Sequence, residues 1–236
     1  MRGIPAATRQ EGPMLVVFDV DGTLVDSQHA IVAAMTEAYV GNGLAAPSRE
    51  AILGIVGLSV PEAVAVLSAS GLDHPVAAIG DAYKAAFNRA RTAAPKADPL
   101  YPGAREALAA LAARGDVLLG LATGNSRRGV ERFIDTFGFH GVFATTQSAD
   151  DAPSKPHPGM LLLACAEAGV TPEETVMIGD TTFDMQMARA AGARAIGVAW
   201  GYHPPERLAA AGAHTVLSRF DDLIPALSLP QAEATA

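Results

Sequence analysis

The sequence predicts an α/β fold, in which a doubly wound, Rossmann-like parallel sheet carries an inserted all-helical cap. Two observations support this prediction. Short apolar segments alternate with helical patterns over the C-terminal part of the chain, as they do when helices cover both faces of a parallel sheet. A long stretch after the first apolar segment holds helical patterns only, which indicates a separate insert.

Six short segments are expected to form the strands of the sheet. They are apolar along their whole length rather than at alternate positions, which is typical of strands that are buried on both faces. The six segments are residues 14–20, 117–123, 142–146, 175–180, 195–200 and 214–218.

Four helical patterns fill connections between these strands. Several of them end on glycine, which is a common helix stop because it adopts the left-handed conformation without strain. The four patterns cover residues 103–115, 126–138, 157–169 and 181–192.

The helical cap is expected at residues 25–96, because helical patterns follow one another there with no strand pattern between them. This stretch is too long for a single crossover helix. Ser27 is placed to cap the first of these helices. The helical patterns are residues 27–43, 59–71 and 74–92, the α/β core takes residues 14–24 and 97–227, and residues 1–13 and 228–236 are expected to be disordered tails.

The composition narrows the class of partner. The chain has 236 residues, a formal net charge of −8 and no block of basic residues, which argues against nucleic acid or an anionic membrane. A small anionic substrate stays open, because such a molecule responds to the local field. No apolar run reaches the roughly 18 residues of a membrane span. The single cysteine, Cys165, allows no internal disulfide and fits a cytoplasmic protein, whereas the oligomeric state is not indicated.

Polar and charged residues follow several of the expected strands at the point where each strand ends. The carboxyl ends of parallel strands meet at one edge of a sheet, and ligands bind there. These residues are Asp19 and Asp21 after the first strand, Thr123, Gly124 and Asn125 after the second, Lys155 in the loop before residues 157–169, and Asp180 and Asp184 after the fourth.

Together these residues suit phosphoryl transfer, although each of them alone has a structural explanation, such as a helix cap or a surface charge. Asp19 can attack phosphorus, and Asp21 can protonate the leaving oxygen and later take a proton from water. Lys155 and the Thr123 hydroxyl can bind phosphate oxygens. Asp19 and Asp180 can supply oxygen ligands to Mg²⁺. Replacing Lys155 by alanine is expected to slow the reaction and to leave folding intact.

Four motifs resemble those of the haloacid dehalogenase superfamily, namely DVDGT at 19–23, ATGN at 122–125, SKPHP at 154–158 and GDTTFD at 179–184. The likeness extends over residues 14–225. The helical insert is similar to the cap of the phosphoglycolate phosphatase-like branch of that superfamily.

The resemblance implies a role for each matching residue. It makes Asp19 the nucleophile and Asp21 the acid and base of the reaction. It implies that Thr123, Gly124, Asn125 and Lys155 bind phosphate, that Asp19, Asp180 and the backbone carbonyl of Asp21 hold Mg²⁺, and that Asp184 supports these ligands without touching the ion.

The expected function is that of a Mg²⁺-dependent phosphatase, which hydrolyses a small phosphorylated metabolite through an aspartyl-phosphate. A β-phosphoglucomutase-like phosphomutase and a pyrophosphatase of the same superfamily are alternatives. The TGNSRR form of the second motif departs from the serine-rich form usual in those mutases. A receiver-type phospho-acceptor domain is the non-enzymatic alternative, and the helical insert together with Asp21 argues against it.

Residues 54–62, with the sequence GIVGLSVPE, are expected to face the site and to contact the substrate. Because these residues are mostly small and apolar, they predict little recognition by charge. The sequence does not choose among phosphoglycolate, a sugar phosphate, a nucleotide and pyrophosphate.

Overall fold

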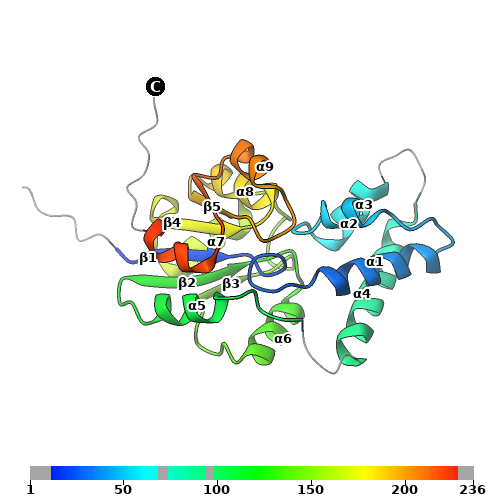
Figure 1. Ribbon diagram of the computed structural model, residues 1–236, viewed down its shortest axis with the longest axis horizontal. Helices are drawn as coiled ribbons and strands as arrows, with labels where there is room; N and C mark the ends of the chain where they lie inside the picture. Colours follow the sequence, from blue (N-terminus) through cyan, green and yellow to red (C-terminus); the bar gives the residue numbers. More distant parts are fainter. Residues whose placement is uncertain (1–11, 69–73, 94–97, 228–236) are drawn as a thin grey trace, which may run out of the picture.

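Six parallel strands form one sheet, which lies on the left in Figure 1. The computed structural model describes residues 12–68, 74–93 and 98–227, so the expected tails lie almost wholly outside the described residues. The strand order is β3-β2-β1-β4-β5-β6, which confirms the doubly wound parallel sheet. The strands are β1 (Met14–Phe18), β2 (Val117–Ala122), β3 (Thr145–Gln147), β4 (Thr175–Gly179), β5 (Arg194–Val198) and β6 (Thr215–Leu217).

The central strand β1 is apolar throughout because both of its faces are covered. Val16 of β1 pairs in register with Leu119 of β2 on one side and with Val176 of β4 on the other. Val16 belongs to the apolar cluster on one face of the sheet, and its neighbour Val17 belongs to the cluster on the opposite face. The chain that leaves β1 therefore starts from a fixed, fully buried position.

The strand expected at residues 142–146 is wrong in its position, because β3 begins only at Thr145. Phe143 packs instead with Phe133 and Phe139, with ring centroids 6.3 and 6.1 Å away. The first part of the segment thus contributes to the apolar core, and only Thr145 and Thr146 at its end join the sheet. An apolar run alone does not distinguish these two ways of burying side chains.

Helices cover both faces of the sheet (Figure 1). One face carries α5 (Ala104–Ala112), α6 (Arg127–Phe137) and α10 (Leu223–Leu227), and the other carries α7 (Gly159–Ala168), α8 (Thr182–Ala191) and α9 (Pro205–Ala211). The sequence did not predict α9, α10 or the two 3₁₀ helices at Pro172–Glu174 and Phe220–Asp222, because none is longer than seven residues. No helix in the described part of the chain is long and apolar enough to cross a lipid bilayer.

The insert is helical in its described residues, and its helices pack mainly on one another. They share an apolar cluster of their own, in which Met35, Tyr39, Ile52 and Val64 are buried. The helices are α1 (Gln28–Gly41), α2 (Arg49–Leu53), α3 (Val60–Ser68) and α4 (Val76–Ala93). The short helix α2 was not expected, and the exact boundaries of core and cap stay a prediction.

Two chain segments connect the insert with the sheet, and they run side by side. The Asp26 amide donates a 2.9 Å hydrogen bond to the carbonyl of Pro99. Val25 and Leu100, the neighbours of these residues, form an antiparallel bridge. The insert therefore joins the rest of the chain through one paired link.

Two neighbouring leucines of α7 test how much the core contributes to stability. Leu161 is fully buried, whereas Leu162 is 43% exposed. Leu161→Ala should lower the free energy of unfolding by about 2–5 kcal/mol, because it leaves a cavity in the core. Leu162→Ala, the same change on the same helix, should alter it by less than about 0.5 kcal/mol. Urea denaturation measures both values, and equal losses would contradict the packing described above.

Candidate active site

Polar and acidic residues that the sequence placed at the site converge at the carboxyl edge of the sheet. Asp19 follows β1, Asp180 follows β4 and Thr123 follows β2, and these are adjacent strands. Because the chain passes from β1 to β2 on one side while β4 lies on the other side, this edge is a switch point of the doubly wound sheet. All three side chains are buried, with at most 1% exposure.

Lys155 is buried against Asp19 and is not a surface residue. Its ammonium lies 2.9 Å from Asp19 Oδ1 and donates a 2.6 Å hydrogen bond to Asp184 Oδ1. Burial lowers the pKa of Lys155, but the charges of Asp184 and Asp19 outweigh this effect and raise the pKa above its ordinary value. The ammonium is therefore a permanent positive charge next to Asp19.

Asp180 is held in place by two donors. Thr23 Oγ1 donates to Asp180 Oδ1 and the Tyr202 amide donates to Oδ2, both over 2.8 Å. Burial, followed by the charges of Asp19 and Asp184, raises the pKa of Asp180 well above its usual range. Neither donor was identified from the sequence, although Thr23 stands within the first motif and nothing in the sequence marks Tyr202.

The arrangement fits a divalent cation. Asp19, Asp180 and Asp184 each place one carboxylate oxygen within 4.8 Å of the others. With all three carboxylates ionised, the group would carry two negative charges beyond the one that the ammonium of Lys155 compensates. The one polar partner of Asp19 among the described residues is that ammonium, and burial raises the pKa of Asp19 to about 7 despite Lys155, which lowers it. Mg²⁺, which prefers oxygen ligands, would supply the missing charge.

The carboxylate of Asp21 is not part of this acidic group. Ser27 Oγ donates to Asp21 Oδ1 over 2.5 Å, and Asn125 Nδ2 donates to Oδ2 over 2.6 Å. Both oxygens of the Asp21 carboxylate thus already have donors. Ser27 occupies the N-cap position of α1 as expected, but its side chain makes no capping hydrogen bond to the helix. Its hydroxyl orients Asp21 instead.

The turn after β1 requires glycine because it packs on Asp180. Gly22 has φ of 89°, in the left-handed region that other residues rarely adopt. A Cβ at this position would lie only 2.3 Å from Asp180 Oδ2. Gly22 therefore lets the chain reverse immediately after Asp21 and brings Asp21 and Asp180 to the same site.

Residues 54–62 face the site, as expected, and contact two of the motifs. A Cβ on Gly124 would lie 2.5 Å from the carbonyl oxygen of Leu58, so the close approach depends on glycine. The Ser59 amide donates a 2.7 Å hydrogen bond to Ser154 Oγ. The insert thus rests on the predicted phosphate-binding loop and on the lysine motif.

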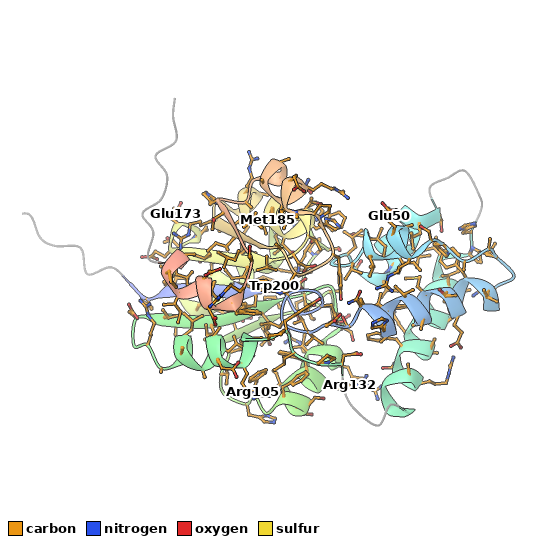
Figure 2. All side chains as sticks on the ribbon, in the orientation of Figure 1. Glu50, Arg105, Arg132, Glu173, Met185 and Trp200 are labelled. Carbon is orange, nitrogen blue, oxygen red and sulfur yellow. The ribbon has the colours of Figure 1, made fainter. Side chains whose placement is uncertain are left out.

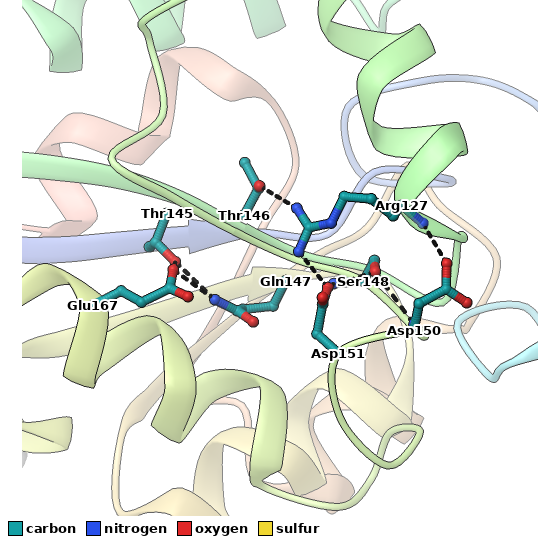
Figure 3. Close-up of polar contacts among 8 residues, drawn as sticks. All are labelled: Arg127, Thr145, Thr146, Gln147, Ser148, Asp150, Asp151 and Glu167. Carbon is teal, nitrogen blue, oxygen red and sulfur yellow. Dashed lines mark hydrogen bonds and ion pairs between the residues drawn. The ribbon is translucent and has the colours of Figure 1, made fainter.

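A polar network fixes the segments around the phosphate-binding loop (Figure 3). Arg127, the first residue of α6, donates from its backbone amide to Asp150 over 2.7 Å and from its guanidinium to Asp151. Between these segments, the amide of Ala149 donates to the carbonyl of Asn125 over 2.8 Å. The loop that follows β2 is therefore tied to the segment that leads to Lys155.

A cavity of about 320 Å³ opens between the insert and the sheet edge, with Asp19 and Asp21 in its wall. The residues of 54–62 that line the cavity carry no charge, but Lys84 of α4 and Arg128 of α6 line it as well. The arginine stands in the TGNSRR motif and the lysine is one of three in the chain. The fold alone brings them to the same cavity.

Known proteins resemble this chain over most of its length. A family model described as haloacid dehalogenase-like hydrolase matches residues 16–198. The protein of Dickeya dadantii named probable phosphatase IndB is 36% identical, with 90% of this chain and 92% of that protein covered. A phosphoglycolate phosphatase of Pseudomonas putida is 31% identical, with 92% and 81% covered. The crystal structure of a hydrolase from Pseudomonas syringae matches with a TM-score of 0.80 at 26% identity, over 91% of this chain and 97% of that chain.

The burial of Lys155 revises the expectation that its substitution leaves folding intact. Lys155→Met should lower the free energy of unfolding by about 3–5 kcal/mol, because Asp19 and Asp184 then stay buried without their counter-charge. Urea denaturation without divalent cations measures this loss. Lys84→Met, the same change at an exposed lysine, is the control and should stay within about 0.5 kcal/mol of the wild type. Similar losses for both variants would show that Lys155 is not the counter-charge of this site.

Proposed function

The chain belongs to the haloacid dehalogenase-like hydrolase family and is a phosphatase, and we propose that it hydrolyses a small phosphorylated metabolite through an aspartyl-phosphate on Asp19. The environment of the Asp19 carboxylate is the observation that supports this proposal. Its carboxylate lines the cavity, is 1% exposed, and has one polar partner among the described residues, the Lys155 ammonium 2.9 Å from Oδ1. A carboxylate that is held by one cation and keeps its second oxygen available is suited to nucleophilic attack.

Two aspartates account for both steps of the proposed reaction. In the first step a carboxylate oxygen of Asp19 bonds to phosphorus while the bond from phosphorus to the ester oxygen breaks, and Asp21 in its acid form protonates that oxygen. In the second step Asp21 takes a proton from water, whose oxygen bonds to phosphorus while the bond to Asp19 breaks. Inorganic phosphate leaves, and both side chains return to their starting forms.

The phosphoryl group is proposed to lie between Lys155 and the loop after β2. Lys155 offers fixed positive charge, and the loop offers the Thr123 hydroxyl and the amide of Gly124 in the wall of the cavity. Because these donors are in place before the reaction, little reorganisation is needed as charge develops. The residues of this loop are Thr123, Gly124 and Asn125.

Mg²⁺ is proposed as the cofactor, held by the side chains of Asp19 and Asp180 and by the backbone carbonyl of Asp21. When bound, the ion neutralises the charge of the phosphoryl oxygens. Asp184 is proposed to act from outside the ligand shell, because its carboxylate accepts a hydrogen bond from Lys155 and so keeps the ammonium beside Asp19.

The substrate of this proposal is a phosphomonoester of a small metabolite. Phosphoglycolate is the first compound to test, because the relative from Pseudomonas putida is named for it. We also propose that the protein is cytoplasmic. Its proposed domains are an α/β core at residues 14–24 and 97–227 and a helical cap at residues 25–96.

Trapping the intermediate tests the mechanism. Asp19→Asn should abolish turnover and leave no covalent phosphate. Asp21→Asn keeps the nucleophile and should lower hydrolysis by roughly 10²–10⁴-fold, the usual contribution of general acid–base catalysis. With 4-nitrophenyl phosphate, whose leaving group needs no proton, Asp21→Asn should accumulate phosphate on Asp19, visible by mass spectrometry of quenched samples. Asp116→Asn, at an exposed position beside Arg114, is the control and should keep full activity.

The same experiment separates the alternatives. Phosphate trapped on a residue other than Asp19, or turnover by Asp19→Asn, would refute the mechanism. Transfer of the phosphoryl group to a second sugar hydroxyl would indicate a phosphomutase, and rapid release from pyrophosphate alone would indicate a pyrophosphatase. One lasting phosphorylation per chain would indicate a receiver-type domain.

Metal binding has a readout that is independent of activity. Mg²⁺ should raise the melting temperature, because it binds the folded acidic group, and at 100 times its Kd it should add about 2.7 kcal/mol of stability. Asp180→Asn removes one ligand and should remove most of this increase, whereas Asp116→Asn should keep it. Differential scanning calorimetry measures the shift. An equal increase in both variants would indicate a general salt effect and no specific site.

A further inference from the structure

We propose that the alcohol half of the substrate is amphipathic, with an apolar body of about ring size and a second anionic group that lies away from the phosphate. This inference rests on the proposed phosphatase function. It adds a substrate class, which is an ester of a hydroxy compound that carries a carboxylate or a second phosphate beyond its apolar part.

One part of the cavity wall is apolar and aromatic. The whole cavity has a volume of about 320 Å³, at the small end of the roughly 300–1,000 Å³ of pockets that bind drug-sized ligands. A two-carbon acid would leave most of this wall uncovered. The apolar lining residues are Ile31 and Met35 of α1, Ile55 and Val56 of the facing loop, and Tyr83 and Phe87 of α4. The rings of the last two are stacked, with centroids 5.5 Å apart.

The same face of α4 also carries a cation. Tyr83, Lys84, Phe87 and Asn88 all line the cavity, which is the spacing of one helical face. Lys84 therefore lies directly beside the aromatic wall. A ligand that covers Tyr83 and Phe87 therefore lies next to a basic residue of the same helix.

Helix α6 supplies two further cations from the opposite side. Arg128 and Arg132, one helical turn apart, line the cavity as well. Arg132 faces α4 (Figure 2), and its Nη1 donates a 2.9 Å hydrogen bond to Asn88 Oδ1. Three basic side chains from two helices thus line the same cavity as Asp19.

Lys84 and Arg128 are the cations of this cavity that lack an acidic partner among the described residues, whereas Arg132 is already bonded. The one acidic side chain in the wall besides Asp19 and Asp21 is Asp150, and it already accepts a hydrogen bond from the amide of Arg127. Among the residues that the structure describes, neither Lys84 nor Arg128 makes an ion pair or a side-chain hydrogen bond. An anionic group on the ligand would relieve the repulsion between these cations and gain charge-assisted hydrogen bonds.

Four esters of primary alcohols, matched in the reacting group, test this inference. They are 2-phenylethyl phosphate, which has the apolar body alone, its 4-carboxy and 4-phosphono derivatives, which add the second anion, and phosphoglycolate, which has an anion without the body. At least one of the two derivatives should show a kcat/KM about tenfold or more above both 2-phenylethyl phosphate and phosphoglycolate, which corresponds to about 1.4 kcal/mol. The preferred derivative tells whether a carboxylate or a phosphate-like group is recognised.

Variants assign the preference to the named cations. Lys84→Gln and Arg128→Gln together should reduce the advantage of the preferred derivative over 2-phenylethyl phosphate by about tenfold, mainly through a higher KM, because the second anion is bound in both ground and transition states. Arg114→Gln, which removes an arginine outside the cavity that pairs with Asp116, should keep the advantage.

The outcomes separate this inference from the function on which it rests. If the wild type hydrolyses 2-phenylethyl phosphate or phosphoglycolate but neither derivative better, the function stands and the inference is wrong. A preference that survives the double variant overturns the assignment to Lys84 and Arg128. If the wild type with Mg²⁺ hydrolyses none of the four esters and also fails on 4-nitrophenyl phosphate, the proposed function fails, and the inference fails with it.

Discussion

A lysine buried between two buried aspartates is the constraint on which the rest of the structure depends. Moving such charges out of water costs several kcal/mol per ion unless they meet partners in good geometry. Lys155, Asp19 and Asp184 come from the loop before α7, the end of β1 and the first turn of α8. A parallel sheet brings such distant segments together, because the carboxyl ends of its strands share one edge. The apolar strands thus stabilise the fold and also bring these charges together.

The two aspartates of the first motif differ in how firmly they are held, and this difference matches their proposed roles. Asp21 accepts hydrogen bonds from Ser27 and Asn125, so its carboxylate has a defined direction. Asp19 has a single polar partner among the described residues, the Lys155 ammonium 2.9 Å from its Oδ1. An acid and base must point at one proton, whereas a nucleophile needs unshared electron pairs. Residues two positions apart in the sequence therefore have different surroundings.

Local sequence patterns were enough to predict most strands and helices and to identify the residues that converge at the site. Apolar runs gave the strands to within a few residues, except that Phe143 packs into the core where a strand was expected. The acids were found because each follows a strand. Features that depend on packing were not accessible from the sequence. The burial of Lys155 and the meeting of Lys84 with Arg128 depend on residues far apart in the sequence, and the Ser27 hydroxyl turns to Asp21 only because the chain folds back between them.

The paired link between the insert and the sheet separates recognition from chemistry along the chain. The proposed reacting and metal-binding groups lie outside residues 25–96, whereas the apolar wall of the cavity lies within them. The covalent connection between insert and sheet is confined to two neighbouring chain segments at Asp26 and Pro99. Mutation of the apolar wall can therefore change which ester is accepted while the reacting groups stay as they are, as long as Ser27, whose hydroxyl orients Asp21, is kept. A chain organised in this way can acquire new substrates in evolution without first losing its catalytic apparatus.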